Sequence, residues 1–329
     1  MIISKTPFRV SFFGGGTDYP IWYEKNGGMT LSATINKYAY ITVRELPPFF
    51  DYKHVIQYYR KEEVNSLEEI KHPVVREAAK LLDIKKGIEM VYNADLPARS
   101  GLGSSSTFTV GFLNALYAFE NKTVTKRELA LNAINLEQNI IGEAVGSQDQ
   151  TIAAFGGFNV IEFNKHKTFQ VQEILISEKR LQSLEENLML CFTGFSRTAE
   201  KIAKFQIEST PYKEKELNMM IEIVNQAKEI INNNKTSMDE LGKLLNEQWS
   251  LKKSLTKYIS DPAIDDIYNT AINAGAIGGK LLGAGGGGFM LFYAKKENHE
   301  KIKKSLNNKL IVPFRFEKTG SQIIYFSHD

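Results

Sequence analysis

The stretch from Asp95 to Thr107 joins a glycine-rich turn to three consecutive hydroxyl side chains and reads D-L-P-A-R-S-G-L-G-S-S-S-T. Gly101 and Gly103 let the backbone turn tightly and come close to a ligand. The apolar periodicity that follows predicts a helix, with Phe108, Phe112, Leu116 and Phe119 on one face. The first amides of that helix lack intrahelical partners and lie at the positive end of its dipole, so the stretch suits a polyphosphate.

The same stretch has a simpler interpretation, because a glycine turn with a serine N-cap is ordinary before a helix. Three serines exceed what one cap requires, however, and Arg99 adds positive charge. The loop is not a Walker A motif, because no Gly-Lys-Ser/Thr ends it. We therefore predict that a polyphosphate binds at Pro97, Arg99, Ser100, Gly101, Leu102, Gly103, Ser104, Ser105 and Ser106.

A second glycine-rich loop follows the strand predicted for Ile2 to Phe13, which carries Arg9 among alternating apolar positions. A loop of three glycines that ends in a carboxylate lets the backbone approach a small polar molecule. Asp18 can accept hydrogen bonds from two neighbouring hydroxyls of a sugar. Alternatively, the loop is a glycine-rich hairpin end in which Asp18 is an ordinary turn residue. The predicted sugar contacts are Gly15, Gly16, Thr17 and Asp18.

Two acidic residues in the middle of the chain could act on a phosphate or a proton. Glu137 lies on the apolar line of the helix predicted for Lys126 to Ile141, and a buried carboxylate needs a cation. That cation could be a Lys or Arg partner, or Mg²⁺ if the phosphate site is near, and spacing alone does not decide. Asp149, in Gly-Ser-Gln-Asp-Gln, could cap a helix or take part in chemistry.

The glycine-rich stretch from Gly278 to Phe289 contains four consecutive glycines, whose ordering costs more backbone entropy than that of other residues. This cost suggests a functional loop with Lys280 as a phosphate contact, although a bulged turn is the simpler alternative. Arg197 follows the turn at Gly194 and could likewise bind a substrate phosphate or begin a helix as a solvated side chain.

The composition excludes several classes of function. The chain has 329 residues, 43% hydrophobic and 24% charged, which is typical of folded proteins and long enough for two domains. Its 41 Lys and Arg against 38 Asp and Glu do not favour nucleic acid or a membrane as partner. The single cysteine, Cys191, excludes an intramolecular disulfide and a cysteine-based zinc cluster. No apolar run approaches the roughly 20 residues of a membrane span. No signal peptide pattern is present, so we expect a cytoplasmic protein.

Periodicity predicts an α+β fold. We expect strands at residues 2–13, 29–44, 54–59, 87–92, 158–163, 188–192, 289–294, 310–316 and 322–326. We expect helices at residues 73–82, 126–141, 213–232, 237–257, 262–274 and 298–307. The Lys and Glu residues of the C-terminal helices are expected on a solvated face, with Trp249 and the leucines in the core.

The motifs resemble those of the GHMP kinases, which include galactokinase, homoserine kinase, mevalonate kinase and phosphomevalonate kinase. The family's phosphate loop, Pro-x-x-x-Gly-Leu-Gly-Ser-Ser, is matched by Pro97, Gly101, Leu102, Gly103, Ser104 and Ser105, and Ser106 stands where many members have alanine. The family's first motif is matched by Arg9, Thr17 and Asp18, but Gly-Gly-Gly replaces the Gly-Glu-His of galactokinase. This departure argues against galactose as the substrate.

The resemblance implies a role for each motif. It implies that Ser105 and Glu137 hold Mg²⁺. It implies that Asp149 takes the proton of the attacking hydroxyl while Arg9 stabilises charge on that oxygen. The third motif would pack its backbone against the active site, with the substrate contacting Gly285 and Gly286. We add the hypothesis that Lys280, Arg99 and Arg197 neutralise a distal phosphate of the substrate, which predicts that a sugar without this phosphate is a poor substrate.

The resemblance covers almost the whole chain and implies a two-domain GHMP kinase fold. Residues 1–175 would form an α/β domain like that of ribosomal protein S5, and residues 176–329 a ferredoxin-like α+β domain. ATP and Mg²⁺ would be the cofactors and a sugar phosphate the partner. A fold relative that binds RNA is disfavoured by the charge balance.

The sequence of the phosphate loop is most similar to that of the family branch that phosphorylates the anomeric hydroxyl of D-glycero-D-manno-heptose 7-phosphate. The product would be the 1,7-bisphosphate used in nucleotide-activated heptose synthesis for lipopolysaccharide or capsule. An anomeric kinase of L-fucose or an N-acetylhexosamine, and a catalytically silent sensor of sugar and ATP, are the alternatives. A homodimer is left open.

Overall fold

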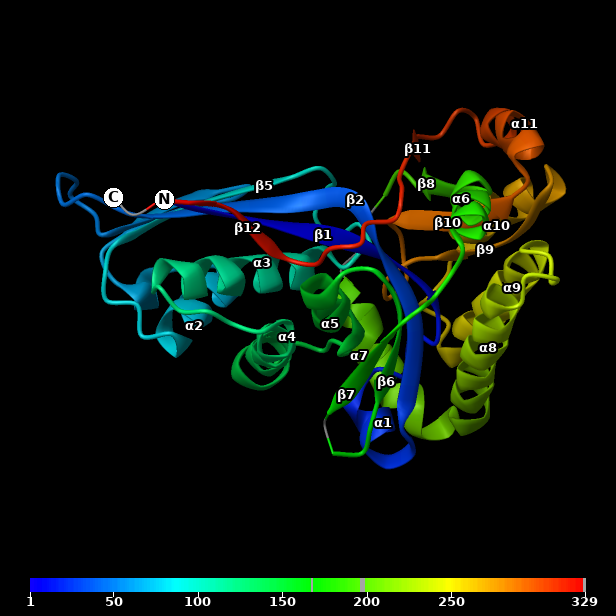
Figure 1. Ribbon diagram of the computed structural model, residues 1–329, viewed down its shortest axis with the longest axis horizontal. Helices are drawn as coiled ribbons and strands as arrows, with labels where there is room; N and C mark the ends of the chain where they lie inside the picture. The colour runs from blue at the N-terminus through cyan, green and yellow to red at the C-terminus, as the bar shows by residue number, and fades with distance from the viewer. Residues whose placement is uncertain (167, 196–198, 328–329) are drawn as a thin grey trace.

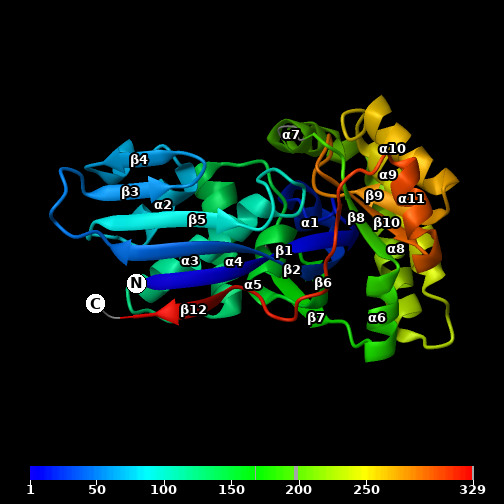
Figure 2. The ribbon, with the colours of Figure 1, turned by 90° about the horizontal axis from the view of Figure 1, so that it is seen from above.

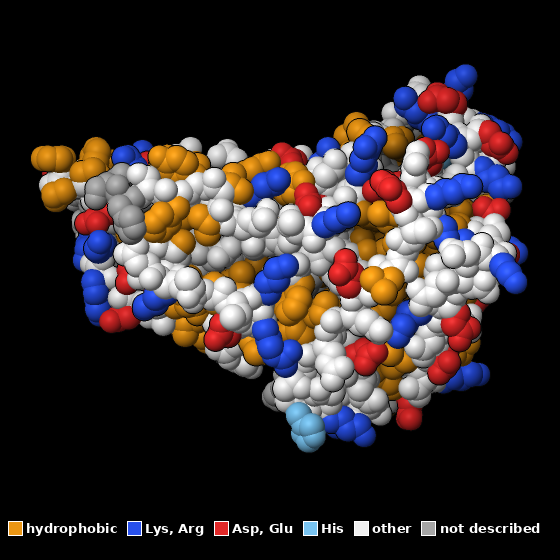
Figure 3. Space-filling view, in the orientation of Figure 1, with side chains coloured by type: hydrophobic (Ala, Val, Ile, Leu, Met, Phe, Trp, Pro, Cys, Tyr) orange, Lys and Arg blue, Asp and Glu red, His pale blue; other side chains and the backbone are white. Residues whose placement is uncertain are grey.

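The structure is a computed structural model that describes residues 1–166, 168–195 and 199–327. Within these residues, the chain forms an eight-stranded sheet and a four-stranded sheet, each covered by helices (Figure 1). No helix of the described part combines the length and apolar character needed to cross a membrane. On the face shown in Figure 3, basic and acidic side chains are interspersed, as the charge balance leads one to expect.

The larger sheet contains most of the N-terminal strands and the last strand of the chain. Its members are β1 (Ile2–Phe13), β2 (Gly28–Glu45), β3 (His54–Gln57), β4 (Lys61–Val64), β5 (Ile88–Ala94), β6 (Phe158–Phe163), β7 (Phe169–Glu173) and β12 (Gln322–Phe326). The main path runs β12-β1-β2-β5-β3-β4, an order visible in Figure 2, while β6 pairs with β2 and β7 with β6. All pairs are antiparallel except β3 with β5.

One face of the larger sheet is covered by helices (Figure 1). These are α2 (Pro73–Leu81), α3 (Ser104–Phe119), α4 (Lys126–Asn135) and α5 (Gln148–Phe155), and the short α1 (Pro20–Asn26) follows β1. Helix α3 is apolar almost all round, with Phe112, Leu113 and Leu116 fully buried, because it packs against the sheet and against neighbouring helices. This burial fixes the helix whose first turn carries the three serines.

The smaller sheet has the order β11-β8-β10-β9. It consists of β8 (Leu188–Phe192), β9 (Ala276–Leu281), β10 (Phe289–Ala294) and β11 (Ile311–Val312). Strand β10 is buried throughout, as expected of a central strand between helical layers. The helices of this part of the chain are α6 (Glu178–Glu186), α7 (Ala199–Ser209), α8 (Glu214–Asn232), α9 (Asp239–Leu255), α10 (Pro262–Asn273) and α11 (His299–Ser305).

Most predicted elements are present, and the differences have local causes. The predicted helix at residues 126–141 ends as α-helix at Asn135 and continues as a π-helical turn, Leu136–Ile141. Gly278 to Lys280 extend strand β9 rather than forming a loop, because the small residues allow close packing on α9. The change of sheet lies between β7 and β8, but β12 returns to pair with β1, so the last strand joins the larger sheet. The division into residues 1–175 and 176–329 stays a prediction.

Candidate active site

A cavity of about 350 Å³ is lined by residues of both halves of the chain. Strand β1, the loop before α3 and the start of α5 line it from one side, and α7, α9, β9 and the turn after β9 from the other. The structure thus brings together three motifs that are far apart in the sequence. The predicted site residues that line the cavity are Arg9, Gly15, Gly16, Asp18, Arg99, Gly101, Gly103, Ser104, Ser105, Ser106, Asp149 and Lys280.

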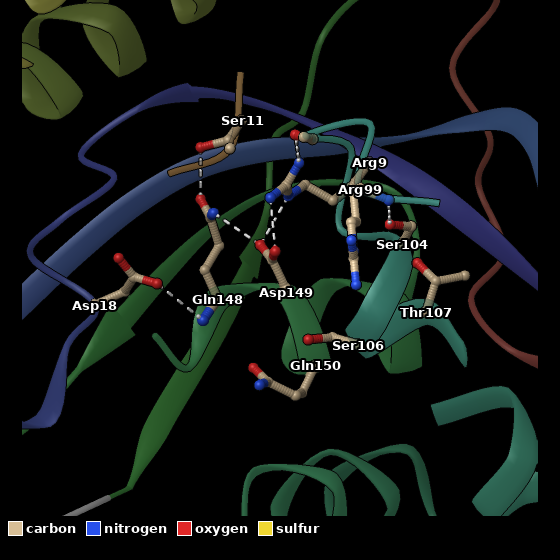
Figure 4. A network of polar contacts seen from close by, with 12 residues as sticks. Arg9, Ser11, Asp18, Arg99, Ser104, Ser106, Thr107, Gln148, Asp149 and Gln150 are labelled. Atoms are coloured by element: carbon tan, nitrogen blue, oxygen red, sulfur yellow. Dashed lines mark hydrogen bonds and ion pairs between the residues drawn. The ribbon is translucent and has the colours of Figure 1, made fainter. Parts of the chain in front are cut away.

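Arg9 and Asp149 form a two-point ion pair in the wall of this cavity (Figure 4). Arg9 Nε donates to Asp149 Oδ1 at 2.7 Å and Arg9 Nη2 donates to Oδ2 at 2.6 Å. Gln148 Nε2 also donates to Oδ1, at 3.1 Å. A carboxylate has about four lone-pair directions, so Oδ2 keeps one for a further hydrogen bond. The side chain of Asp149 is 26% exposed, which leaves it accessible to a hydroxyl in the cavity.

The phosphate loop presents free amides to the same cavity. The first intrahelical bond of α3 runs from the Thr107 amide to the Gly103 carbonyl, so the amides of the three serines before Thr107 have no acceptor within the helix. Arg9 Nη1 donates to the Gly101 carbonyl at 2.7 Å and holds the loop beside Asp149. Gly101 has a φ of 79°, and a Cβ there would lie 2.6 Å from the Leu282 carbonyl oxygen. The turn after β9 therefore packs directly on the phosphate loop.

Asp18 fixes the first glycine-rich loop to the start of α5 (Figure 4). Its Oδ1 accepts from the Gly16 amide at 2.9 Å and its Oδ2 from the Gln148 amide at 3.3 Å. Burial raises the pKa of Asp18. A Cβ on Gly146 would overlap the Asp18 carboxylate, so only glycine fits at that position. Gln148, which we did not predict, links Asp18 to Asp149 and also accepts from the Ser11 hydroxyl at 2.8 Å.

Glu137 is fully buried behind the phosphate loop, and its partner is Ser106. Ser106 Oγ donates to Glu137 Oε2 at 2.9 Å, and Gln150 Nε2 donates to the same oxygen. Ser105, the predicted partner, is exposed, because one step along a helix turns a side chain by about 100°. Burial raises the pKa of Glu137 to about 7. Glu137 Oε1 has no hydrogen-bond partner among the described residues.

Several predicted residues lie away from the cavity. Gly285 and Gly286 pack against Ile259, whose carbonyl accepts from the Gly286 amide at 3.0 Å, and the cavity is lined instead by Gly283 and Ala284. Thr17 also lies outside the lining, where its hydroxyl donates to the carbonyls of Gly14 and Met29. The remaining predicted residues outside the lining are Pro97, Ser100, Leu102 and Glu137. Arg197 lies outside the described residues.

Lys252 lines the cavity although the sequence placed it among the solvated charges of the C-terminal helices. Its ammonium is buried and donates to the carbonyl of Leu281 at 3.3 Å and to that of Gly283. The burial of Lys252 could have been predicted from its position on an apolar helix face, as the burial of Glu137 was. Lys252 falls on an apolar line of α9 at helical spacing, together with Leu241, Leu245, Gln248 and Leu255.

Two family models match the chain: the GHMP kinases N terminal domain at residues 70–157 and the GHMP kinases C terminal at residues 227–312. A D-glycero-alpha-D-manno-heptose 7-phosphate kinase of Campylobacter jejuni is 31% identical to this chain and covers 97% of both proteins. The chain is a GHMP kinase. The resemblance of its three motifs is thereby confirmed, and so is the prediction of an ATP-dependent phosphotransferase.

One solved structure matches the fold over its whole length, and a longer relative matches in part. The crystal structure of a D-glycero-D-manno-heptose 1-phosphate kinase from Bacteroides thetaiotaomicron has a TM-score of 0.75 and 26% identity, and the match covers 100% of both chains. A bifunctional fucokinase/GDP-fucose pyrophosphorylase of Arabidopsis thaliana is 26% identical over 91% of this chain and 30% of that protein. The predicted two-domain α+β fold of the GHMP kinases is confirmed.

Proposed function

We propose that this GHMP kinase transfers the γ-phosphoryl group of ATP to the anomeric hydroxyl of D-glycero-D-manno-heptose 7-phosphate, giving the 1,7-bisphosphate for heptose nucleotide synthesis. The observation that carries the proposal is the Arg9–Asp149 pair, which faces the same cavity as the free amides of α3. The name of the Campylobacter relative supports this acceptor, and the name of the Bacteroides relative supports the heptose but refers to its 1-phosphate. A cytoplasmic setting is part of the proposal, supported by the single buried cysteine.

In this mechanism the chain contributes position and charge. The amides of residues 104–106 and the dipole of α3 hold the nucleotide phosphates. Asp149 Oδ2 accepts the proton of the sugar hydroxyl through its remaining lone pair, while the Arg9 guanidinium stabilises the oxygen that attacks. Asp18 and the backbone of Gly16 orient the sugar. Phosphoryl transfer depends mostly on such positioning and on electrostatic stabilisation.

The donor set behind the phosphate loop fits Mg²⁺. Glu137 Oε1 is a buried oxygen without a partner in the described residues, and the Ser106 hydroxyl lies next to the same carboxylate. Magnesium prefers oxygen ligands and takes one or two from the protein together with phosphate and water. Glu137 and a serine of the loop, Ser106 in preference to Ser105, would hold the ion. When bound, Mg²⁺ neutralises charge on the nucleotide phosphates.

The alternatives are an anomeric kinase of another sugar and a silent sensor. The fucokinase relative supports L-fucose as the rival substrate. The close pairing of Arg9 with Asp149 beside a free lone pair disfavours the sensor. ADP release should be measured with a panel of sugar 7-phosphates, sugar 6-phosphates and free sugars. The proposal predicts the highest kcat/KM for the heptose 7-phosphate. A free sugar used as efficiently would refute the substrate, and no ADP with any sugar would refute the kinase.

A further inference from the structure

Two lysines from different parts of the chain bring positive charge to the cavity. Lys280, on β9, is 2% exposed and donates to the carbonyls of Ser11 and Phe12 at 2.8 and 2.9 Å. Lys252, on α9, is 5% exposed and donates to the carbonyls of Leu281 and Gly283. Both line the cavity. An ammonium has three N–H donors, so each lysine has one donor beyond these carbonyl contacts.

Within the described residues, neither lysine forms an ion pair with a carboxylate. The neighbouring carboxylates of Asp149 and Asp265 are paired with Arg9 and Lys253 instead. Burying a charge without a counter-charge is costly. Burial accordingly lowers the pKa of Lys252 to about 8, with a smaller contribution from the charge of Arg9. Burial also lowers the pKa of Lys280 well below its ordinary value, and the nearby charge of Lys252 lowers it further. An anion bound between the two would supply the missing negative charge.

The anion bound by these two lysines should be one that no other group of the cavity already binds. In the proposed mechanism, the first amides of α3 and the Arg99 side chain bind the nucleotide phosphates. Lys280 is bonded to the end of β1, from which the loop carrying Asp18 starts, and Lys252 is close enough to Asp18 and Asp149 for their charges to raise its pKa. Lys280 thus belongs to the acceptor side of the cavity, and Lys252 lies between that side and the phosphate loop, because its partner Gly283 packs on Gly101.

We infer that Lys252 and Lys280 form an anion subsite that binds a phosphate group carried by the acceptor sugar, and that Lys252 makes the enzyme prefer phosphorylated over neutral acceptors. This inference rests on the proposed function, because the phosphate in question is part of the acceptor sugar of the proposed reaction. Both lysines belong to the C-terminal half of the chain, and Lys280 joins that half to β1 through the carbonyls of Ser11 and Phe12.

The test uses Lys252→Met, which keeps the length of the side chain up to Cε and removes the charged Nζ. Lys243→Met is the matched control, because Lys243 lies on the same helix, is exposed and pairs with Glu240 on the surface. We expect kcat/KM for the heptose 7-phosphate to fall about 100-fold in Lys252→Met, as expected for removing one partner of a buried charge contact. The kcat/KM for the unphosphorylated heptose should fall at least tenfold less than that for the heptose 7-phosphate, and the control should match the wild type.

Calorimetry with the sugar phosphate in the absence of nucleotide separates this inference from the proposed reaction. Lys252→Met should bind the sugar phosphate about 100-fold more weakly than the wild type does. Lys252→Arg, which keeps the charge, should retain most of the affinity and guards against a loss that reflects misfolding. If no sugar is turned over but this pattern of binding is found, the proposed reaction fails and the subsite stands. Equal losses for phosphorylated and neutral sugars, or unchanged binding of the sugar phosphate, would overturn the subsite.

Discussion

Arg9 and Asp149 lie 140 residues apart in the sequence, yet they share two parallel hydrogen bonds of 2.7 and 2.6 Å. The backbone amide of Arg9 donates to the Leu102 carbonyl, and its Nη1 donates to the Gly101 carbonyl. One residue of β1 therefore holds both the acidic side chain and the phosphate loop. We infer that the spacing between the acceptor hydroxyl and the nucleotide is set at this residue.

Replacing Asp149 by asparagine should lower kcat by about 10² to 10⁴, the usual effect of removing a general base. The amide is close in shape to the carboxylate, so nucleotide binding should stay within about twofold of the wild type. Steady-state kinetics and nucleotide titration together check both statements. Asp266→Asn, an exposed position on α10, is the control. A variant Asp149→Asn with normal turnover would rule out the assignment of the base.

Replacing Arg9 by lysine should also lower kcat, because an ammonium cannot reproduce the two parallel bonds and the third bond to Gly101. We expect a loss of about tenfold or more. The double variant with Asp149→Asn should lose much less than the product of the two single losses, since both residues act as one unit. Strictly multiplicative losses would show that the two residues act independently.

The stability of the metal-free protein should depend on the protonation of Glu137. Its pKa is raised from 4.5 to about 7, so the folded state holds this proton more tightly than the unfolded chain does. The stabilisation is complete below pH 4.5 and is lost as the pH rises through 7. Between pH 5 and 8 the free energy of unfolding should therefore fall by about 1 to 3 kcal/mol relative to Glu137→Gln.

Urea unfolding of both proteins across this pH range measures the effect. The glutamine cannot ionise, so the variant should lack this part of the pH dependence. Added Mg²⁺ should restore stability to the wild type above pH 7 and leave the variant nearly unchanged, because the ion binds the ionised carboxylate. Parallel pH curves for the two proteins would contradict the role of Glu137.

Replacing Gly146 by alanine should impair sugar binding selectively. The new Cβ would overlap the Asp18 carboxylate and push it away from the amides of Gly16 and Gln148. We expect the KM of the sugar to rise about tenfold or more, since misplacing an orienting group is costly. The KM of ATP should stay nearly constant. Adding Asp18→Ala to this variant should have little further effect, and a large additional loss would show that Gly146 acts elsewhere.

Some features could be predicted from the sequence because the residue types that form them have few physical uses. The glycines and serines before Thr107 predicted an anion site, and the structure gives that loop free amides at a cavity, although the binding of an anion there stays a prediction. Glu137 was predicted from its place on an apolar line, and it is fully buried. The repeating apolar residues likewise predicted most of the strands and helices, but not β4, β7, β9, α1, α6 or α7.

Features that depend on packing across the chain could not be predicted. Spacing along a helix could not choose between Ser105 and Ser106, because that choice depends on where Glu137 comes to lie. Lys252 looked like a surface residue, since Lys253 follows it and its carbonyl partners, at the end of β9 and in the turn after it, are distant in sequence. Gly285 and Gly286 were expected at the substrate, but Ile259, a residue without any motif, occupies the space beside them.

A crystal structure with a non-hydrolysable ATP analogue, Mg²⁺ and heptose 7-phosphate tests the central claim most directly. The account predicts nucleotide phosphates on the amides of residues 104–106, the metal at Glu137, and the anomeric hydroxyl within hydrogen-bond distance of Asp149. It also predicts the distal phosphate beside Lys252. A nucleotide bound away from the three serines, or a sugar whose anomeric hydroxyl points away from Asp149, would contradict the account.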